Sequence, residues 1–170
     1  FYTYDNEIDN YRQDHYQLFY SYEFNSSLNI NTALHYTRGK GYYEQYKKDR
    51  DFSDYQLDNV ILSSDTINST DLIQRKWLDN HFYGGIFSVN YNKEKLNLNV
   101  GGGWNQYIGD HYGEIMWAQF TSNSDIRDRW YEGSGTKNDL NVYAKFKYKF
   151  FNKLNVFIDL QERIIQYEID

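Results

Sequence analysis

Histidines and carboxylates are the side chains of this sequence with the most obvious chemistry, and their spacing limits what they can do. The chain has four histidines and no cysteine. No His-x3-His pair occurs, and the best local cluster of ligand types joins His111 to Asp110 and Glu114. Such spacing is weak support for a metal site. We therefore read these residues as polar groups at a wet rim and predict no metal site and no resident cofactor.

The acids give no catalytic pair. Asp49, Asp51, Asp54 and Asp58 lie close together in the sequence, but paired acids need a cleft that shifts their pKa values, and the sequence indicates none. It also contains no Gly-x-Ser-x-Gly motif, no cysteine nucleophile and no phosphate-binding glycine loop. We predict no catalytic residue and no enzymatic activity. A glycosidase would need two carboxylates that the sequence does not single out.

Aromatic residues interleaved with cations are the strongest binding signal. They gather in residues 37–82 and 105–138, which we predict to be two long loops. Tyrosine and tryptophan can stack on sugars, chelate rings or heme-like ligands, although they can equally pack the loops on each other. The candidate ligand-binding residues are Tyr42, Tyr43, Tyr46, Trp77, Trp117 and Trp130.

The elements that position these residues follow a period of two. Apolar and polar residues alternate, as they do in strands with one apolar side. In residues 16–24, for example, Leu18, Tyr20 and Tyr22 face one way, while Gln17 and Ser21 face the other. The pattern predicts six strands, at residues 16–24, 28–36, 83–91, 96–104, 140–150 and 154–160.

The connections alternate between short and long. Residues 25–27, 92–95 and 151–153 have the length and composition of hairpin turns. Two connections as long as 37–82 and 105–138 are rare in a compact soluble domain. Outer-membrane barrels, in contrast, have short periplasmic turns and long outer loops. We therefore expect an all-β, antiparallel up-and-down meander of about six strands that is part of a larger transmembrane β-barrel.

The two sides of the predicted strands differ in a way that fits a barrel. Aromatic residues flank an aliphatic band, as at membrane interfaces, although tyrosine and phenylalanine also favour strands in general. The polar side would line a wet lumen. A β-sandwich, in which the apolar side meets a second sheet, remains the alternative. The candidate lumen-lining residues are Gln17, Asn29, Asn31, Asn90, Asn97 and Asn99.

Composition excludes other classes. A net charge of −6 in 170 residues argues against nucleic acid as a partner, since binding it requires a basic face. The absence of cysteine excludes a disulfide framework. No apolar run approaches the roughly 20 residues that a transmembrane helix needs.

Three sequence runs resemble a known family. They are LHYTRGKGYYEQYK (residues 34–47), TDLIQRKWLDNHFYG (70–84), and GGGWN (101–105) followed by GDHYG (109–113). Each is similar to strand-to-outer-loop segments of TonB-dependent receptors from Bacteroides-type bacteria. The resemblance implies a 22-stranded outer-membrane barrel with an N-terminal plug, which imports metal chelates, cobalamin or glycans with energy from the TonB complex.

This chain departs from a whole receptor, since it has no plug, no TonB-contacting segment and too few strands. The resemblance therefore implies that residues 1–170 are a fragment of the barrel domain. The expected function is barrel wall plus outer loops of a nutrient-import receptor in the bacterial outer membrane. Its expected partners are outer-membrane lipid, the rest of the barrel and plug, the TonB complex through regions outside this chain, and the imported nutrient. The alternative is a soluble all-β, lectin-like carbohydrate-binding module.

Overall fold

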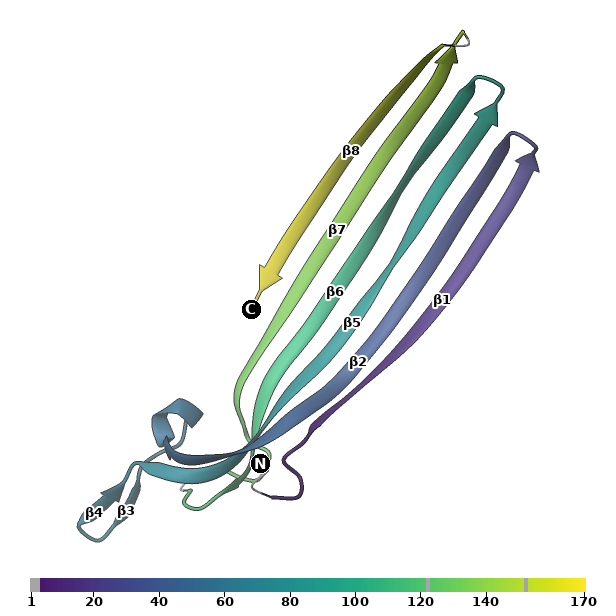
Figure 1. Cartoon of the computed structure of the whole chain (residues 1–170). Coiled ribbons are helices and arrows are strands. Elements are labelled where there is room, and N and C mark those ends of the chain that lie inside the picture. The colour runs from purple at the N-terminus through teal and green to yellow at the C-terminus, as the bar shows by residue number, and fades with distance from the viewer. Residues whose placement is uncertain (1–3, 122, 152) are drawn as a thin grey trace.

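The protein is one long antiparallel meander. A computed structural model describes residues 4–121, 123–151 and 153–170. Six strands form a single sheet in the order β1-β2-β5-β6-β7-β8 (Figure 1), so the predicted all-β meander is confirmed. The strands are β1 (Asp9–Asn25), β2 (Leu28–Asp51), β5 (Ser69–Lys93), β6 (Leu96–Ala118), β7 (Arg129–Phe150) and β8 (Leu154–Ile169).

Each predicted strand lies within an observed one. The predicted turns at 25–27 and 92–95 also coincide with hairpins, since β1 ends at Asn25 and β5 ends at Lys93. The third predicted turn, 151–153, joins β7 to β8, and its residue 152 lies outside the described residues. Turn-forming residues between two alternating runs were sufficient to place these hairpins.

The predicted loop boundaries are wrong, because the strands are much longer than the alternation showed. β2 and β5 remain paired out to Asp51 and Ser69, so the first loop shrinks from 37–82 to residues 52–68. The second shrinks from 105–138 to residues 119–128. Backbone pairing does not require one apolar side, and beyond Tyr36 both sides of the strands carry polar and aromatic residues. The period-two signal therefore fades while the hydrogen-bonded ladder continues.

The register gives the sheet two faces of different chemistry. We call one the leucine face and the other the asparagine face. Directly paired residues share a face, so the register assigns every position. The leucine face includes Leu18, Leu34, Leu98, Leu140 and Leu160, and the asparagine face includes Asn29, Asn31, Asn90, Asn97 and Asn99.

The hairpins are staggered along the strands. Leu28, at the start of β2, shares one row of the ladder with Tyr91 and, through Leu98, with Phe146. β5 runs two residues past this row to Lys93, and β7 runs four past it to Phe150. Each hairpin is therefore displaced by two residues from the hairpin before it, which is one residue per strand. With about 3.3 Å per residue and about 4.8 Å between strands, this offset corresponds to a tilt of roughly 35°.

A small hydrophobic core lies at the opposite end from the hairpins. The 52–68 connection forms a 3-10 helix, η1 (Phe52–Tyr55), and a hairpin of β3 (Val60–Leu62) and β4 (Asp65–Ile67) (Figure 1). Its side chains pack over the asparagine face at the loop end of the sheet. The buried members of this loop core are Phe52, Tyr55, Leu57, Leu72, Ile115 and Trp130.

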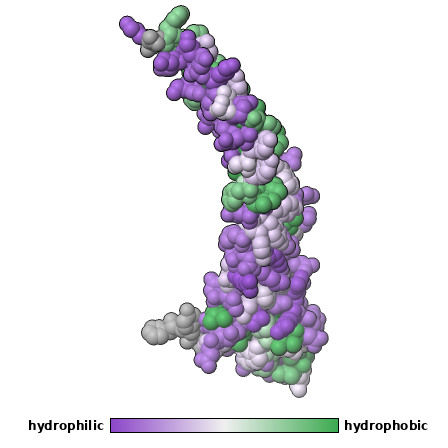
Figure 2. Space-filling model, turned by 90° about the vertical axis from the view of Figure 1, so that its right-hand side faces the viewer, coloured by the Kyte–Doolittle hydropathy of each residue, from purple (hydrophilic) through white to green (hydrophobic). Residues whose placement is uncertain are grey.

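Outside this core, the buried positions among the described residues are glycines and polar residues such as Thr37, Glu44 and Asp139. Seen from the side, the molecule is a thin, bent arm that thickens at the loop end (Figure 2). Leu18 is 64% exposed and Tyr20 is 58% exposed on the leucine face. Within the described part of the chain, no helix has the length and apolarity that a membrane crossing requires.

Candidate functional site

The six residues predicted to line a lumen all lie on the asparagine face. Three of them form a cross-strand ladder, in which Asn90 Nδ2 donates to Asn29 Oδ1 at 2.9 Å and Asn99 Nδ2 donates to Asn90 Oδ1. Asn31 Nδ2 also donates to Asn29 Oδ1, at 3.1 Å. Asn97 lies beside the ladder, two residues before Asn99 on β6. The amides of this ladder are neutral, and charged side chains flank them: Glu23 pairs with Asn29, Lys145 with Asn99 and Lys147 with Asn97.

Gln17 lies further along the same face, where the sheet surface is hollowed. The hollow has a volume of about 660 Å³. Its histidines are held by hydrogen bonds: His15 Nδ1 lies 2.9 Å from Thr37 Oγ1, and His35 Nε2 lies 2.7 Å from Asn105 Oδ1. The residues that line it are Gln13, His15, Gln17, His35, Thr37, Phe82, Asn105, Tyr107, Lys137 and Asp139.

A second hollow continues the first toward the loop end. It has a volume of about 360 Å³ and shares Tyr107 and Lys137 with the larger one. Its floor is backbone, because Gly109, Gly133 and Gly135 occupy adjacent positions on β6 and β7. Nothing lies within 4 Å of the position that a Cβ at Gly135 would take. The open part of the floor therefore lies at Gly135, since the Tyr107 ring covers Gly109 and Asp170 O lies 3.2 Å from the Cβ position of Gly133.

Tyrosines wall this glycine-floored hollow. Tyr107 Oη donates to Asn80 Oδ1 at 2.9 Å, which fixes its ring beside Gly109. Tyr131 and Tyr167 stand on the other sides, and each has a lysine near its ring: Lys76 Nζ is 5.8 Å from the Tyr131 centroid, and Lys137 Nζ is 5.4 Å from that of Tyr167. Burial raises the pKa of Tyr107 and of Tyr131, so both phenols stay protonated at neutral pH and can donate hydrogen bonds.

The hollow can therefore hold a flat or ring-shaped ligand. Tyrosine rings offer apolar faces with a polar tip, and they lose little conformational entropy when they contact a ligand. Lys137 and His111 add polar groups at the border. This combination of apolar walls and few polar groups is typical of binding sites for small molecules.

The residues predicted as ligand-binding loops lie in strands, and the structure does not bring them to one site. Tyr42 and Trp77 are directly paired on the leucine face, with ring centroids 4.7 Å apart. Tyr112 extends the row at 5.8 Å from Trp77, and Trp77 Nε1 donates to Glu114 Oε2 at 2.8 Å. Their placement in loops was wrong, because β2, β5 and β6 continue through them.

The other four candidates have separate roles. Tyr43 lies on the asparagine face opposite Lys76, and Tyr46 donates its hydroxyl to Asp71. Trp117 is exposed near the end of β6. Trp130 belongs to the loop core, where its ring packs 4.9 Å from that of Tyr55. For Trp130, therefore, packing rather than ligand binding describes what the side chain does.

Trp130 is buried because it occupies a bulge. Gly113 pairs with Tyr131 and Glu114 pairs with Arg129, so Trp130 has no partner in the ladder. Such a bulge redirects a side chain, and the missing Cβ of Gly113 leaves space for both the Trp130 and Tyr131 rings. Other register shifts occur near this end, between Lys47 and Arg50 and between Ile73 and Gln74.

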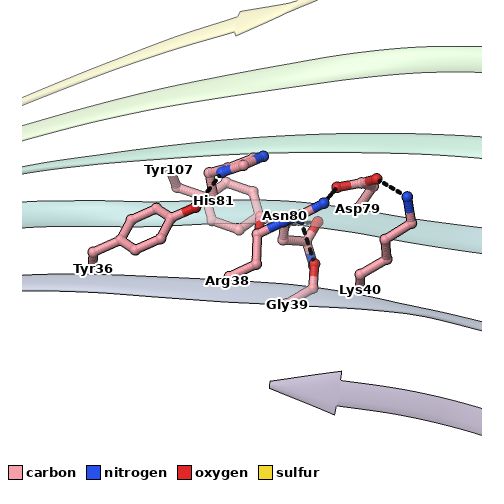
Figure 3. A network of polar contacts seen from close by, with 8 residues as sticks. All are labelled: Tyr36, Arg38, Gly39, Lys40, Asp79, Asn80, His81 and Tyr107. Atoms are coloured by element: carbon pink, nitrogen blue, oxygen red, sulfur yellow. Dashed lines mark hydrogen bonds and ion pairs between the residues drawn. The ribbon is translucent and has the colours of Figure 1, made fainter. Parts of the chain in front are cut away.

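Charged residues replace leucines on the leucine face beyond Tyr36. Figure 3 shows Arg38 and Lys40 of β2 reaching the same carboxylate, Asp79 of β5. The Lys40 Nζ–Asp79 Oδ2 distance is 2.9 Å. Burial favours a raised pKa for Asp79, but hydrogen bonds from Lys40 and Arg38 outweigh it and hold that pKa below its usual range. In the same network Tyr36 Oη lies 2.9 Å from His81 Nδ1.

The three residues of the histidine cluster in the sequence, His111, Asp110 and Glu114, do not come together in the structure. Asp110 accepts a hydrogen bond from Ser134, and Glu114 accepts one from Trp77, both on the leucine face. His111 lies on the opposite face. Across the described residues, no group of three or more histidine, cysteine, aspartate or glutamate side chains is placed to hold a metal ion.

The sequence reasoning missed the floor and one wall of the glycine-floored hollow. Tyr107 and Tyr131 fall in the predicted second loop, but nothing in their spacing linked them to Tyr167. The available signal was Gly109 with the pair Gly133 and Gly135. Glycines that alternate within a strand leave one face bare, but their alignment across β6 and β7 depends on a register that the sequence does not show.

No family model matches this chain, and no curated protein aligns with it significantly.

Proposed function

We propose that this chain is part of the barrel wall of a nutrient-import receptor in a bacterial outer membrane. The leucine face of the hairpin half contacts acyl chains, and the asparagine face lines an aqueous lumen. The loop half stands outside the bilayer, with its glycine-floored hollow open to an imported ligand. The other partners are the rest of the barrel, a plug and the TonB complex, which regions outside residues 1–170 would contact.

The observation that carries the proposal is that the apolar stretch moves with the hairpins. On the leucine face it covers residues 28–36 of β2, 83–91 of β5 and 96–104 of β6, nine residues each. It starts on the row of Leu28 in both β2 and β5 and two residues nearer the hairpins in β6. On β7 the apolar residues of this face continue four residues past that row to Phe150, so the stretch shifts in the direction of the stagger. Nine residues span about 30 Å of strand. At a tilt of roughly 35° this gives about 24 Å of height, close to the ~25 Å apolar band of outer-membrane barrels.

Aromatic rings mark both borders of this band. Tyr16, Tyr36 and Tyr83 form one row across β1, β2 and β5, and Tyr91 and Tyr148 lie near the hairpins. Rings with a polar tip prefer the interface between acyl chains and water. Beyond the first row the leucine face turns charged at Arg38 and Asp79. The change from apolar to charged at an aromatic row supports a bilayer border at this row.

The sheet edges also favour a larger barrel. β1 pairs only with β2, and β8 pairs only with β7, within the described residues. Unpaired backbone groups are costly in hydrocarbon, so only closed barrels span a bilayer. Further strands must therefore pair with β1 and β8 if the leucine face contacts lipid.

The lectin-like alternative has less support. It requires the leucine face to pack against a second sheet, yet Leu34 and Leu140 are among many large apolar side chains that are exposed there. The only other sheet among the described residues is the two-stranded β3-β4 hairpin at the loop end.

Membrane fractionation tests the location. The full-length protein should partition with outer membranes, and its recovery in the cytosol or the soluble periplasm would refute the proposal. A matched pair of variants tests the ligand path. Gly135→Leu fills the hollow without a steric conflict at Cβ, whereas Ser134→Leu adds the same side chain on the opposite face. We expect nutrient uptake by whole cells to fall at least tenfold in the first variant only.

A further inference from the structure

The hairpin end of the sheet carries a concentrated group of lysines, which we call the lysine rim. Two flank the turn between β5 and β6, one lies in the turn between β7 and β8, and two are on the last residues of β7. The two turns are neighbours, since Lys149 N donates to Lys95 O at 2.9 Å. The members of the lysine rim are Lys93, Lys95, Lys147, Lys149 and Lys153.

The lysine rim is electrostatically unsatisfied. None of its five ammonium groups forms an ion pair within the described residues, and Glu94 is the only acid in the two turns. Several cations elsewhere on the sheet are paired, such as Arg38 and Lys40 with Asp79, and Arg75 with Glu44. The rim is also basic in a chain whose net charge is −6. A local excess of positive charge that the protein does not neutralise attracts anions from outside.

The position of the lysine rim indicates that the anion is a lipid headgroup. Lys93 follows Tyr91 by two residues on the leucine face, just beyond the aromatic border of the apolar band. Lys95 and Lys153 lie in the turns beyond Lys93 and Phe150. Lysine side chains near such a border extend along the apolar surface and place their ammonium groups among lipid headgroups. Lys147 and Lys149 lie on the asparagine face and add to the positive potential.

We propose that the lysine rim attracts anionic phospholipids in the leaflet that the hairpins reach. Lys93, Lys95 and Lys153 bind their phosphate groups, and Lys147 and Lys149, on the asparagine face, add to the positive potential. This inference rests on the proposed membrane-spanning function. It adds that the barrel wall is anchored at its hairpin end by charge as well as by aromatic rings. Anionic lipid should therefore be enriched around this part of the barrel relative to zwitterionic lipid.

The test uses the full-length receptor in nanodiscs of phosphatidylcholine with 30 mol% phosphatidylglycerol. Lipids that remain bound are counted by native mass spectrometry. The rim variant replaces Lys93, Lys95, Lys149 and Lys153 by glutamine. The control replaces Lys47, Lys48, Arg50 and Arg127 by glutamine, which removes the same charge near the loop end.

We expect the wild-type receptor to retain phosphatidylglycerol about tenfold over phosphatidylcholine at low salt. The rim variant should lose most of this preference, the control should keep it, and replacement of the same four lysines by arginine should also preserve it. An unchanged preference in the rim variant, or an equal loss in the control, would overturn the inference. A wild-type receptor that inserts without any preference would also overturn it but leave the proposed function intact. Failure of the protein to enter membranes at all would instead refute the proposed function.

Discussion

The same strands meet two different surroundings along their length. In the hairpin half, the leucine face presents Leu18, Leu34 and Phe87 with no side-chain layer over them. In the loop half, the same face of the same strands presents ion pairs and rings, such as Arg75 with Glu44 at 2.6 Å and Arg129 over the Tyr112 ring at 3.7 Å. The antiparallel pairing of β2 with β5 and of β5 with β6 continues through both halves, and its register shifts only near the loop end, at Lys47/Arg50 and Ile73/Gln74.

This difference shows that the side chains, and not the backbone pairing, determine which medium each half of the leucine face favours. In water, an apolar strip this long would be an aggregation hazard, whereas in a bilayer it is the favourable surface. The loop half instead carries charged and polar side chains on the leucine face. It pairs several of its charges locally, such as Arg38 and Lys40 with Asp79, and buries a small core under the 52–68 connection, so its surface suits water.

The largest effect should come from a charge placed in the middle of the apolar strip. Phe87→Arg puts a guanidinium on the leucine face at mid-height, and it should lower the free energy of unfolding from a bilayer by about 3 kcal/mol. Ser88→Arg is the matched control, because the neighbouring position lies on the asparagine face. Urea titrations of the receptor in lipid vesicles measure both. Equal losses in the two variants would mean that the two faces see the same medium.

The loop core should respond to a cavity rather than to a charge. Leu72 is fully buried, so Leu72→Ala should cost about 2 kcal/mol, the lower end of the usual range because the connection can settle into the space. Leu62→Ala, at an exposed position of β3, should have almost no effect. Hydrogen exchange of the Leu57 amide, which donates to Phe52 O at 3.0 Å, reports local opening. Comparable protection in the two variants would contradict the assignment of this core.

The charged network of the loop half should be sensitive to acid. The pKa of Asp79 lies below its usual value in the folded protein because Lys40 and Arg38 donate to it, despite its burial. Its carboxylate therefore stabilises the fold above about pH 4, and this contribution is lost as the pH falls through the lowered pKa. Asp79→Asn should remove that part of the pH dependence. A titration of Asp79 by NMR that shows no downward shift would contradict the network.

The smallest effect on stability should be at the glycine floor. Gly135→Ala should change the free energy of unfolding by less than about 1 kcal/mol, because its Cβ meets nothing within 4 Å. Gly84→Ala should be much worse, since its Cβ would press on backbone atoms of Trp104 and Asn105. Thermal unfolding in detergent compares them. Similar melting temperatures for both variants would show that the two glycines have equal room.

The hairpin half of the fold could be predicted from the sequence because its chemistry alternates. Leu28 to Tyr36 alternates between apolar and polar residues except at Thr32 and Ala33, and Asn25-Ser26-Ser27 marks the turn. The loop half could not, because neither side of the strand is apolar there. Arg38, Lys40 and Tyr42 lie on one side, and Gly39, Gly41 and Tyr43 lie on the other. Strand pairing in the loop half continues the hydrogen-bonded ladder whose register is set in the hairpin half.

The candidate site divides in the same way. The shared face of the six lumen candidates follows from alternation within strands that were correctly placed. The Tyr107, Tyr131 and Tyr167 walls come from three different strands, and their meeting depends on register and on a bulge at Trp130. Single-strand patterns carry no information about such cross-strand alignment.

Spin-label accessibility tests the central claim most directly. The chain has no cysteine, so single cysteines at Leu34, Phe87 and Lys40 can be labelled without removing others from this segment. In the reconstituted receptor, labels at Leu34 and Phe87 should collide readily with oxygen and rarely with a water-soluble nickel chelate, and the label at Lys40 should show the reverse. Equal access of the nickel chelate to all three positions would show that water, not lipid, covers the leucine face.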